Sequence, residues 1–257
     1  MNKNLRIAVS GTYSTGKTTT TIALSLVTGI PRTHARTMRE ILPEAIPGKT
    51  LEDCKPAELL QLGMRRFIER AVFESHCKGG FFSDGSSLHE WVYGKARMIV
   101  GINPNDGHVI QTMKSILRFP FKKIYEEIID NFGKIVKDHA KKSYNEFIHL
   151  PIEFPLVKDG HRPVSERFRF LSDLLLRQTL DELGIKYHIV SGSIEERLEK
   201  ILKIYKFEKI ISIEKAVEDA KRQVELLGVQ IEADAIDAKQ RKSKAPWYAR
   251  LKENVLS

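Results

Sequence analysis

The sequence predicts an α/β protein in which a parallel sheet is covered by helices on both faces. Short apolar runs alternate with longer helical patterns along the chain, which is the arrangement that parallel sheets require. A glycine-containing loop that fits phosphate groups follows the first apolar run. The chain has 257 residues, 42% of them apolar, which is enough to bury a core. Disorder of the whole chain is therefore excluded.

The first predicted unit is a strand, a glycine turn and a helix. Residues 5–10 are apolar and β-branched, and the run ends at Gly11. The helix begins at Lys17, with Ile22, Leu24 and Leu26 suited to packing on the strand. Its threonine run has poor helix propensity, so we expect packing to stabilise it.

A long amphipathic helix is predicted for residues 55–77, followed by a short strand. The expected inward positions are Leu60, Met64, Phe67, Ala71 and Glu74, and the expected outward positions are Arg65, Arg66 and Glu69. The strand, residues 81–84, places Asp84 at its carboxyl end. A further helical pattern covers residues 87–100.

The second half of the chain continues the alternation of helices and strands. We predict helices at 121–142, 166–183 and 194–205, with strands at 147–150 and 185–190. The first of these helices is expected to point Ile124, Ile128, Ile135 and Val136 inward. Residues 214–227 are helical and are followed by a polar tail. We therefore expect a domain at residues 1–210, with a lid at about 155–170, and a helical, basic extension at 211–257.

Residues 11–18, GTYSTGKT, fit the phosphate-loop pattern G-x-x-x-x-G-K-[ST] without a gap. Glycines allow successive backbone N–H groups to face one anion, and the following helix adds its positive end. Lys17 is then placed to bind the terminal phosphates, and the Thr18 hydroxyl to bind Mg²⁺. A P-loop NTPase fold with three layers is the expected architecture.

Two classes of P-loop protein lack support in the sequence. A GTPase would need a guanine-binding N-K-x-D segment, and none is present. An assembly ATPase would be expected to show four apolar residues ending in Asp-Glu, and this pattern is also missing. Kinases of small substrates remain, with Asp84 as the acidic residue that would bind Mg²⁺ or orient the attacking group.

The chain resembles the AAA_28-type group of P-loop kinases over about residues 4–205. That group includes the nicotinamide riboside kinase domain and is related to nucleoside and nucleoside monophosphate kinases. The segments that carry the resemblance are the P-loop, the strand end DGS, LPIEFPLVKDGHR and SERFRFLSDLLLRQTLDELGIKYHIVSGSIEERLEKI. The resemblance implies an ATP- and Mg²⁺-dependent phosphotransferase acting on a nucleoside-like hydroxyl.

The resemblance also implies roles for individual residues. Residues 159–162 match the start of the family's lid, so Arg162, with Arg167 and Arg169 beyond it, would close over the phosphates. The turn 191–193 would pack against the adenine ring. The expected nucleotide-binding residues are thus Gly11, Ser14, Thr15, Gly16, Lys17, Thr18, Thr19, Arg162, Ser191 and Gly192, and the expected catalytic residues are Lys17, Asp84, Arg162 and Arg167. One departure matters: many relatives have arginine after the acidic residue, and here Asp84 is followed by Gly85.

Two segments are candidates for the acceptor site. The first, residues 33–40, places Arg36 and Arg39 on one face if it is helical, with His34 nearby. The second follows Asp84 and contains His89, Glu90, Trp91 and Tyr93. An aromatic side chain there would suit a planar heterocycle or a sugar, although an ordinary core role for Trp91 and His89 stays open.

Composition leaves two alternatives to the kinase. The formal charge is +9, with 42 Lys and Arg against 33 Asp and Glu. Part of it lies in a basic tail, residues 239–250, which keeps a regulatory ATPase module and a polynucleotide 5′-hydroxyl kinase open as alternatives. Two cysteines, Cys54 and Cys77, are too few for a disulfide framework, and no apolar run spans a bilayer, so we expect a cytoplasmic protein. A homo-oligomer is left open.

Overall fold

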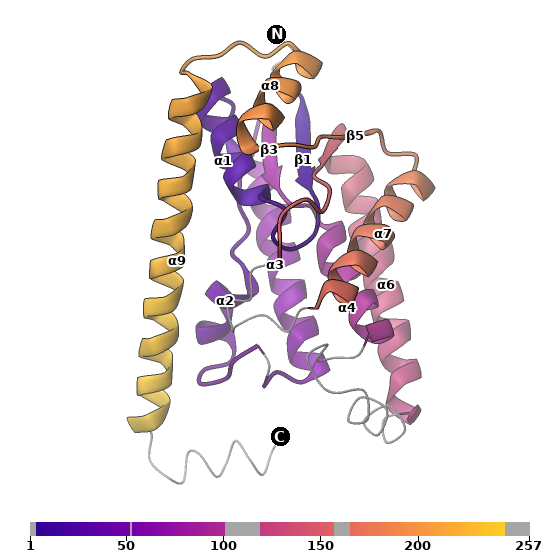
Figure 1. Ribbon diagram of the computed structural model, residues 1–257. Coiled ribbons are helices and arrows are strands. Elements are labelled where there is room, and N and C mark those ends of the chain that lie inside the picture. The colour runs from indigo at the N-terminus through magenta and orange to yellow at the C-terminus, as the bar shows by residue number, and fades with distance from the viewer. Residues whose placement is uncertain (1–3, 52, 101–118, 157–164, 245–257) are drawn as a thin grey trace.

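The sheet contains five parallel strands in the order β2-β3-β1-β4-β5 (Figure 1). The computed structural model describes residues 4–51, 53–100, 119–156 and 165–244, with backbone alone at 119–122, 232 and 234–244. The strands are β1 (Arg6–Ser10), β2 (Arg32–Thr33), β3 (Phe81–Asp84), β4 (Glu146–His149) and β5 (Tyr187–Ile189). Because all five are parallel, their carboxyl ends meet at one edge, where the P-loop, Asp84 and His149 lie.

Alternate residues of the central strands enter two separate cores. Ile7 of β1 belongs to the first core, while its neighbour Ala8 belongs to the second. The first core joins the sheet to α1 (Lys17–Thr28), α8 (Ile194–Tyr205) and the start of α9 (Ile213–Lys244). The second core joins the opposite face to α4 (Leu88–Val100), α6 (Phe119–Ser143) and α7 (Glu166–Glu182). The architecture is therefore the expected three-layer sandwich.

Two further helices border the carboxyl edge of the sheet. These are α2 (Met38–Ala45) and α3 (Pro56–His76), which share a third apolar cluster. Thr37 begins α2 with a capping box, in which its hydroxyl accepts from the Glu40 N–H and the Glu40 carboxylate accepts from the Thr37 N–H. The long helix α9 runs along one side of the molecule, past α1 and α2 (Figure 1).

The strands and helices predicted from the alternation are present, but several details differ. The sequence analysis missed β2, an edge strand of two residues. It placed Arg66 on the outward face of α3, whereas Arg66 is turned toward Glu90 of α4. It ended the last helix near residue 227, whereas α9 continues to Lys244.

The inward face of α6 was also predicted wrongly. Ile124, Ile128 and Ile135 are 58%, 41% and 56% exposed, and Val136 alone of the four predicted positions is buried. The buried face instead contains Ile129, Phe132, Val136 and Ala140. The helix has apolar residues on two faces, and packing against α4 selects the second one. Among the described helices, none has the length and apolar character needed to cross a membrane.

Candidate active site

The P-loop, residues 11–18, has the backbone conformation that a phosphate cradle requires. Gly11, Ser14 and Gly16 all have positive φ angles, of 138°, 56° and 80°. A side chain at Gly11 would place its Cβ 2.6 Å from the carbonyl oxygen of Leu150, so this position has no room for one. Lys17 opens α1 and donates from Nζ to the Thr12 carbonyl across the loop.

Two buried arginines bind the outer side of this loop. Arg169 of α7 donates from Nη2 to the carbonyl of Ser14 at 3.3 Å and to that of Phe154 at 2.7 Å. Arg197 of α8 donates from Nη1 to the carbonyl of Thr15 at 2.6 Å. With the carbonyls bonded on this side, the loop is fixed in its curled form.

Arg197 also connects the P-loop to the turn after β5. Its Nη2 lies 2.8 Å from the Glu153 carboxylate, which accepts the backbone N–H of Gly192 at 2.9 Å. Burial alone would raise the pKa of Glu153, but the hydrogen bonds from Arg197 and Gly192 and the nearby positive charges together outweigh it, so the pKa is lowered. The predicted nucleotide-binding residues of the turn, Ser191 and Gly192, are thereby linked to Thr15.

A cavity opens beside the P-loop at the carboxyl edge of the sheet. Its walls come from the loop, from α2 and the segment before it, from α3 and from α4. The lining residues are Tyr13, Lys17, Thr18, His34, Ala35, Thr37, Met38, Arg39, Leu51, Arg66, Arg70, Asp84, Gly85, His89, Tyr93 and Arg97. The nucleotide loop and the candidate acceptor segments therefore share one space.

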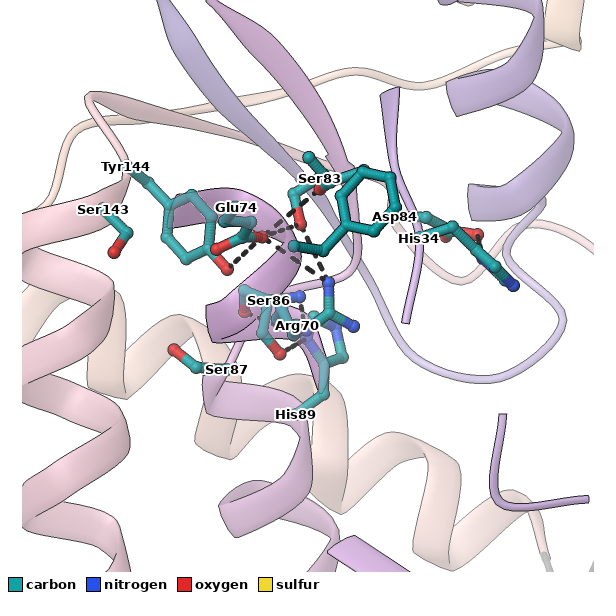
Figure 2. Close-up of polar contacts among 12 residues, drawn as sticks. His34, Arg70, Glu74, Ser83, Asp84, Ser86, Ser87, His89, Ser143 and Tyr144 are labelled. Atoms are coloured by element: carbon teal, nitrogen blue, oxygen red, sulfur yellow. Dashed lines mark hydrogen bonds and ion pairs between the residues drawn. The ribbon is translucent and has the colours of Figure 1, made fainter. Parts of the chain in front are cut away.

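Asp84 lies at the end of β3, where its side chain is 8% exposed. Nδ1 of His34 lies 3.9 Å from its carboxylate (Figure 2). Nε2 of the same ring lies 3.8 Å from the Glu40 carboxylate. Burial opposes ionisation of Glu40, but the close contact with His34 and the hydrogen bonds with Thr37 together outweigh it and lower its pKa to about 2. His34 thus stands between two carboxylates at the mouth of the candidate acceptor site.

His89 connects the turn after Asp84 to the P-loop. Its Nδ1 accepts the N–H of Ser86 at 2.9 Å, and its Nε2 lies 3.0 Å from the carbonyl oxygen of Gly11. Burial lowers the pKa of His89 well below its usual range, and the charges of Lys17 and Arg70 act in the same direction. The ring is therefore neutral, with its proton on Nε2.

Arg70 of α3 is buried between Asp84 and a cluster around Glu74 (Figure 2). Its Nη1 donates to Ser83 at 2.8 Å and lies 3.9 Å from Glu74, which also accepts from Ser83 and Tyr144. Burial disfavours its charge, but the surrounding acidic groups outweigh this and raise the pKa of Arg70. Its Nε and Nη2 have no hydrogen-bond partner among the described residues, and Nη2 is 3.4 Å from where a Cβ on Gly85 would lie.

A chain of buried polar side chains supports the ends of β1 and β4. Ser10 contacts Nδ1 of His149 at 3.2 Å, and Nε2 of His149 contacts Asp173 of α7 at 3.1 Å. Burial would raise the pKa of Asp173, but the hydrogen bond from His149 and the charge of Arg177 lower it. These residues lie behind the P-loop. They connect α7 to β1, which is the strand that precedes the P-loop.

The structure brings most of the predicted site residues together. Lys17, Thr18, Arg39, Asp84 and His89 all line the cavity. Gly11, Ser14, Thr15, Gly16 and Thr19 lie in the adjoining loop and first turn of α1. Arg162 and the part of the predicted lid at residues 157–164 fall outside the described residues.

Four predicted site residues lie elsewhere among the described residues. Arg36 donates to Glu69 and Glu44, with contacts of 2.6 and 2.9 Å, and is not part of the cavity lining. Arg167 is exposed on α7. Trp91 and Glu90 are the other two.

Trp91 packs against α6, with Lys137 Nζ 4.3 Å from its ring centroid, because it is about 200° around the helix from Tyr93. Glu90 lies behind the lining and pairs with Arg66 at 3.0 Å. Of the two aromatic candidates, Trp91 and Tyr93, it is Tyr93 that lies in the cavity wall. Its ring stacks on Tyr13, with the ring centroids 4.6 Å apart.

Arg66, Arg70, Arg97 and Arg197 were not among the predicted site residues, whereas His89 and Tyr93 were considered for the acceptor site. Arg66 and Arg70 occupy successive turns on one face of α3, and His89, Tyr93 and Arg97 do so on α4. That i, i+4 spacing was a signal for a shared face. Arg197 had no such signal, since it lies among the charged residues of an ordinary amphipathic helix.

Parallel strand order, a P-loop between β1 and α1, and a cavity bordered by Asp84 define a P-loop kinase fold. Two solved structures share it. The deoxyadenosine kinase from M. mycoides with bound dCTP superposes with a TM-score of 0.53 and 13% identity, over 79% of this chain and 99% of that chain. The NadR protein in complex with NAD and AMP-PNP gives 0.52 and 16%, over 81% of this chain and 51% of that chain.

Residues 6–197 match the model of the AAA_28 family, described as an AAA domain. The chain therefore belongs to this family. No curated protein sequence matches the chain.

Proposed function

We propose that the protein is an ATP-dependent phosphotransferase that moves the γ-phosphoryl group to a hydroxyl of a small, nucleoside-like molecule. The observation that carries this proposal is the shared cavity: the P-loop residues Lys17 and Thr18 line the same space as Asp84. Phosphoryl transfer asks mainly for cations around the phosphates and an oriented nucleophile, and this cavity offers both. We assign the activity to residues 1–210, with 211–257 as an extension.

In the proposed reaction, the acceptor oxygen forms a bond to the γ-phosphorus while the bond from that phosphorus to the β–γ bridging oxygen breaks. The electron pair of the broken bond leaves with ADP, and the hydroxyl proton passes to the Asp84 carboxylate. The P-loop N–H groups and Lys17 bind the β- and γ-phosphates, and Arg70 adds positive charge beside Asp84. His89 keeps the P-loop and the Asp84 turn at a fixed separation.

The donor set also suits a magnesium ion. Mg²⁺ prefers oxygen ligands and is usually held by one or two protein groups together with substrate phosphates. The Thr18 hydroxyl and the Asp84 carboxylate would provide those groups, since both line the cavity. Within the described residues no cluster of three or more His, Cys, Asp or Glu forms a cage of its own. Bound there with ATP, the ion would neutralise charge on the phosphates.

The test is release of ADP from ATP and Mg²⁺ across a panel of nucleosides, nucleotides and sugars, with Lys17→Ala as the matched inactive variant. We expect acceptor-dependent ADP release that Lys17→Ala abolishes while circular dichroism shows the fold retained. Release at background for every acceptor would contradict the proposal. Slow turnover that no acceptor stimulates would instead favour a regulatory ATPase.

A further inference from the structure

The part of the cavity wall that α2, α3 and α4 contribute is strongly cationic. Four arginines line it, namely Arg39, Arg66, Arg70 and Arg97. Among the described lining residues, Asp84 is the one carboxylate. An uncharged acceptor would not compensate this excess of positive charge, and buried charge without compensation is energetically costly.

The charges of Arg66 and Arg70 are compensated by nearby protein groups. Arg66 contacts both oxygens of the buried Glu90 carboxylate, at 3.0 and 3.1 Å. Arg70 has Glu74 at 3.9 Å and donates to Ser83. These two pairs stabilise α3 against α4 and β3.

Arg97 differs, because no carboxylate of the described residues pairs with it. It is 7% exposed, and its Nε has no hydrogen-bond partner within the part of the chain that the structure describes. Its guanidinium carbon lies 5.3 Å from the centroid of the Phe168 ring. The aromatic face offsets part of the cost of burial. It leaves the guanidinium N–H groups able to bind an anion.

The position of Arg97 separates it from the atoms that receive the phosphoryl group. Arg97 lies eight positions after His89 along α4, or about 12 Å further along the helix. His89 is beside the P-loop and the Asp84 turn. An acceptor with its receiving oxygen at Asp84 could therefore reach Arg97 with a group at its far end.

Resting on the proposed kinase function, we propose that the acceptor carries an anionic group of its own, a phosphate or a carboxylate, and that Arg97 binds that group. Arg97 is then the residue that selects an anionic acceptor over the neutral molecule of the same shape. A charge-assisted bidentate contact is the interaction that a guanidinium makes best with either anion.

The test compares acceptors that differ in a single anionic group. The pairs are uridine with orotidine, for a carboxylate on the base, and adenosine with its 3′- and 5′-monophosphates, for a phosphate on the sugar. We expect the anionic member of at least one pair to have the higher kcat/KM, by about tenfold or more. Preference for the neutral member of every pair would overturn the proposal.

Variants then assign the preference to Arg97. Arg97→Met keeps the apolar stem over Phe168 and removes the charge, and we expect it to abolish the preference without changing the KM for ATP. Arg97→Lys should restore part of it. Arg222→Met, an exposed arginine of α9 that pairs with Asp219, is the matched control. A preference that survives in a folded Arg97→Met protein would overturn the assignment.

Binding measurements separate this inference from the kinase proposal. If no acceptor supports ADP release, the kinase proposal fails, and calorimetric titration of the same pairs still decides the anion site. Tighter binding of anionic members that Arg97→Met abolishes supports the site. Equal binding of both members refutes it.

Discussion

The Nε2 atom of His89 lies 3.0 Å from the carbonyl oxygen of Gly11, so a side chain of α4 is bonded to the first residue of the P-loop. The other ring nitrogen accepts the N–H of Ser86, two residues after Asp84. A single neutral imidazole thus connects the candidate phosphate site with the candidate acceptor site. Because Nδ1 must be free to accept, a proton on both nitrogens is incompatible with this arrangement.

The first prediction concerns stability at acidic pH. His89 in the unfolded chain takes up a proton near pH 6.5, whereas burial lowers its pKa in the folded protein. Above pH 6.5, His89 therefore makes its full contribution to the unfolding free energy. As the pH falls toward the lowered pKa, this contribution decreases by up to about 1.4 kcal/mol per pH unit. Urea unfolding of the wild type and His89→Gln between pH 7.5 and 5 measures this. The variant should lose the dependence that the wild type shows, and equal slopes would contradict the assignment.

Asp84→Asn tests the proposed role in transfer. The amide keeps the shape of the side chain but is a much weaker base, so we expect kcat to fall at least about 100-fold, in the range of general-base effects. ATP binding, measured by calorimetry without Mg²⁺, should change little. Equal losses in binding and turnover would indicate that Asp84 is structural.

Arg197→Met tests the support of the P-loop. The substitution leaves the Thr15 carbonyl without its buried donor, and we expect the unfolding free energy to fall by about 1–3 kcal/mol. The affinity for ATP should also fall, since the loop loses its fixed form. Arg222→Met on α9 serves as the control. Unchanged ATP affinity in a destabilised variant would show that the remaining contacts suffice to shape the loop.

Trp91→Phe distinguishes a packing role from a binding role. Trp91 is buried against α6 and has the Lys137 ammonium over its ring, so we expect a loss of about 1–2 kcal/mol in unfolding free energy. The KM for the acceptor should remain at the wild-type value. A raised KM for the acceptor at unchanged unfolding free energy would instead indicate that Trp91 binds the acceptor.

The alternation of strands and helices was predictable because each element carries its own local pattern. The central strands are short apolar runs, and Ile7, Ala8 and Val9 are fully buried as such runs require. The edge strand β2 was not predictable, because two residues give no period and Arg32 and Thr33 pair with β3 only through tertiary contact. The capping box of Thr37 and Glu40 was a usable signal for α2 that the sequence analysis overlooked.

The site residues were predictable where a sequence motif determines the backbone geometry. They were less predictable where the prediction depended on which face of a helix lines the cavity. The P-loop motif located Lys17 and Thr18 directly. In α4, Trp91 and Tyr93 are both aromatic and both buried, and only the position of α6 decides which of them faces the cavity. The ion pairs of Arg36 with Glu69 and Glu44 depend on how the segment before α2 meets α3, which no local pattern contains.

Arg169 belongs to the first turn of α7, yet its hydrogen bonds are to Ser14 and Phe154, which come from two other segments of the chain. The start of α7 cannot shift without breaking both bonds or pulling the nucleotide loop with it. Any rearrangement of the loop that follows nucleotide binding is therefore transmitted mechanically to the first turn of α7, and the reverse also holds. The loop and the first turn of α7 should protect one another from hydrogen exchange as a single cooperative unit.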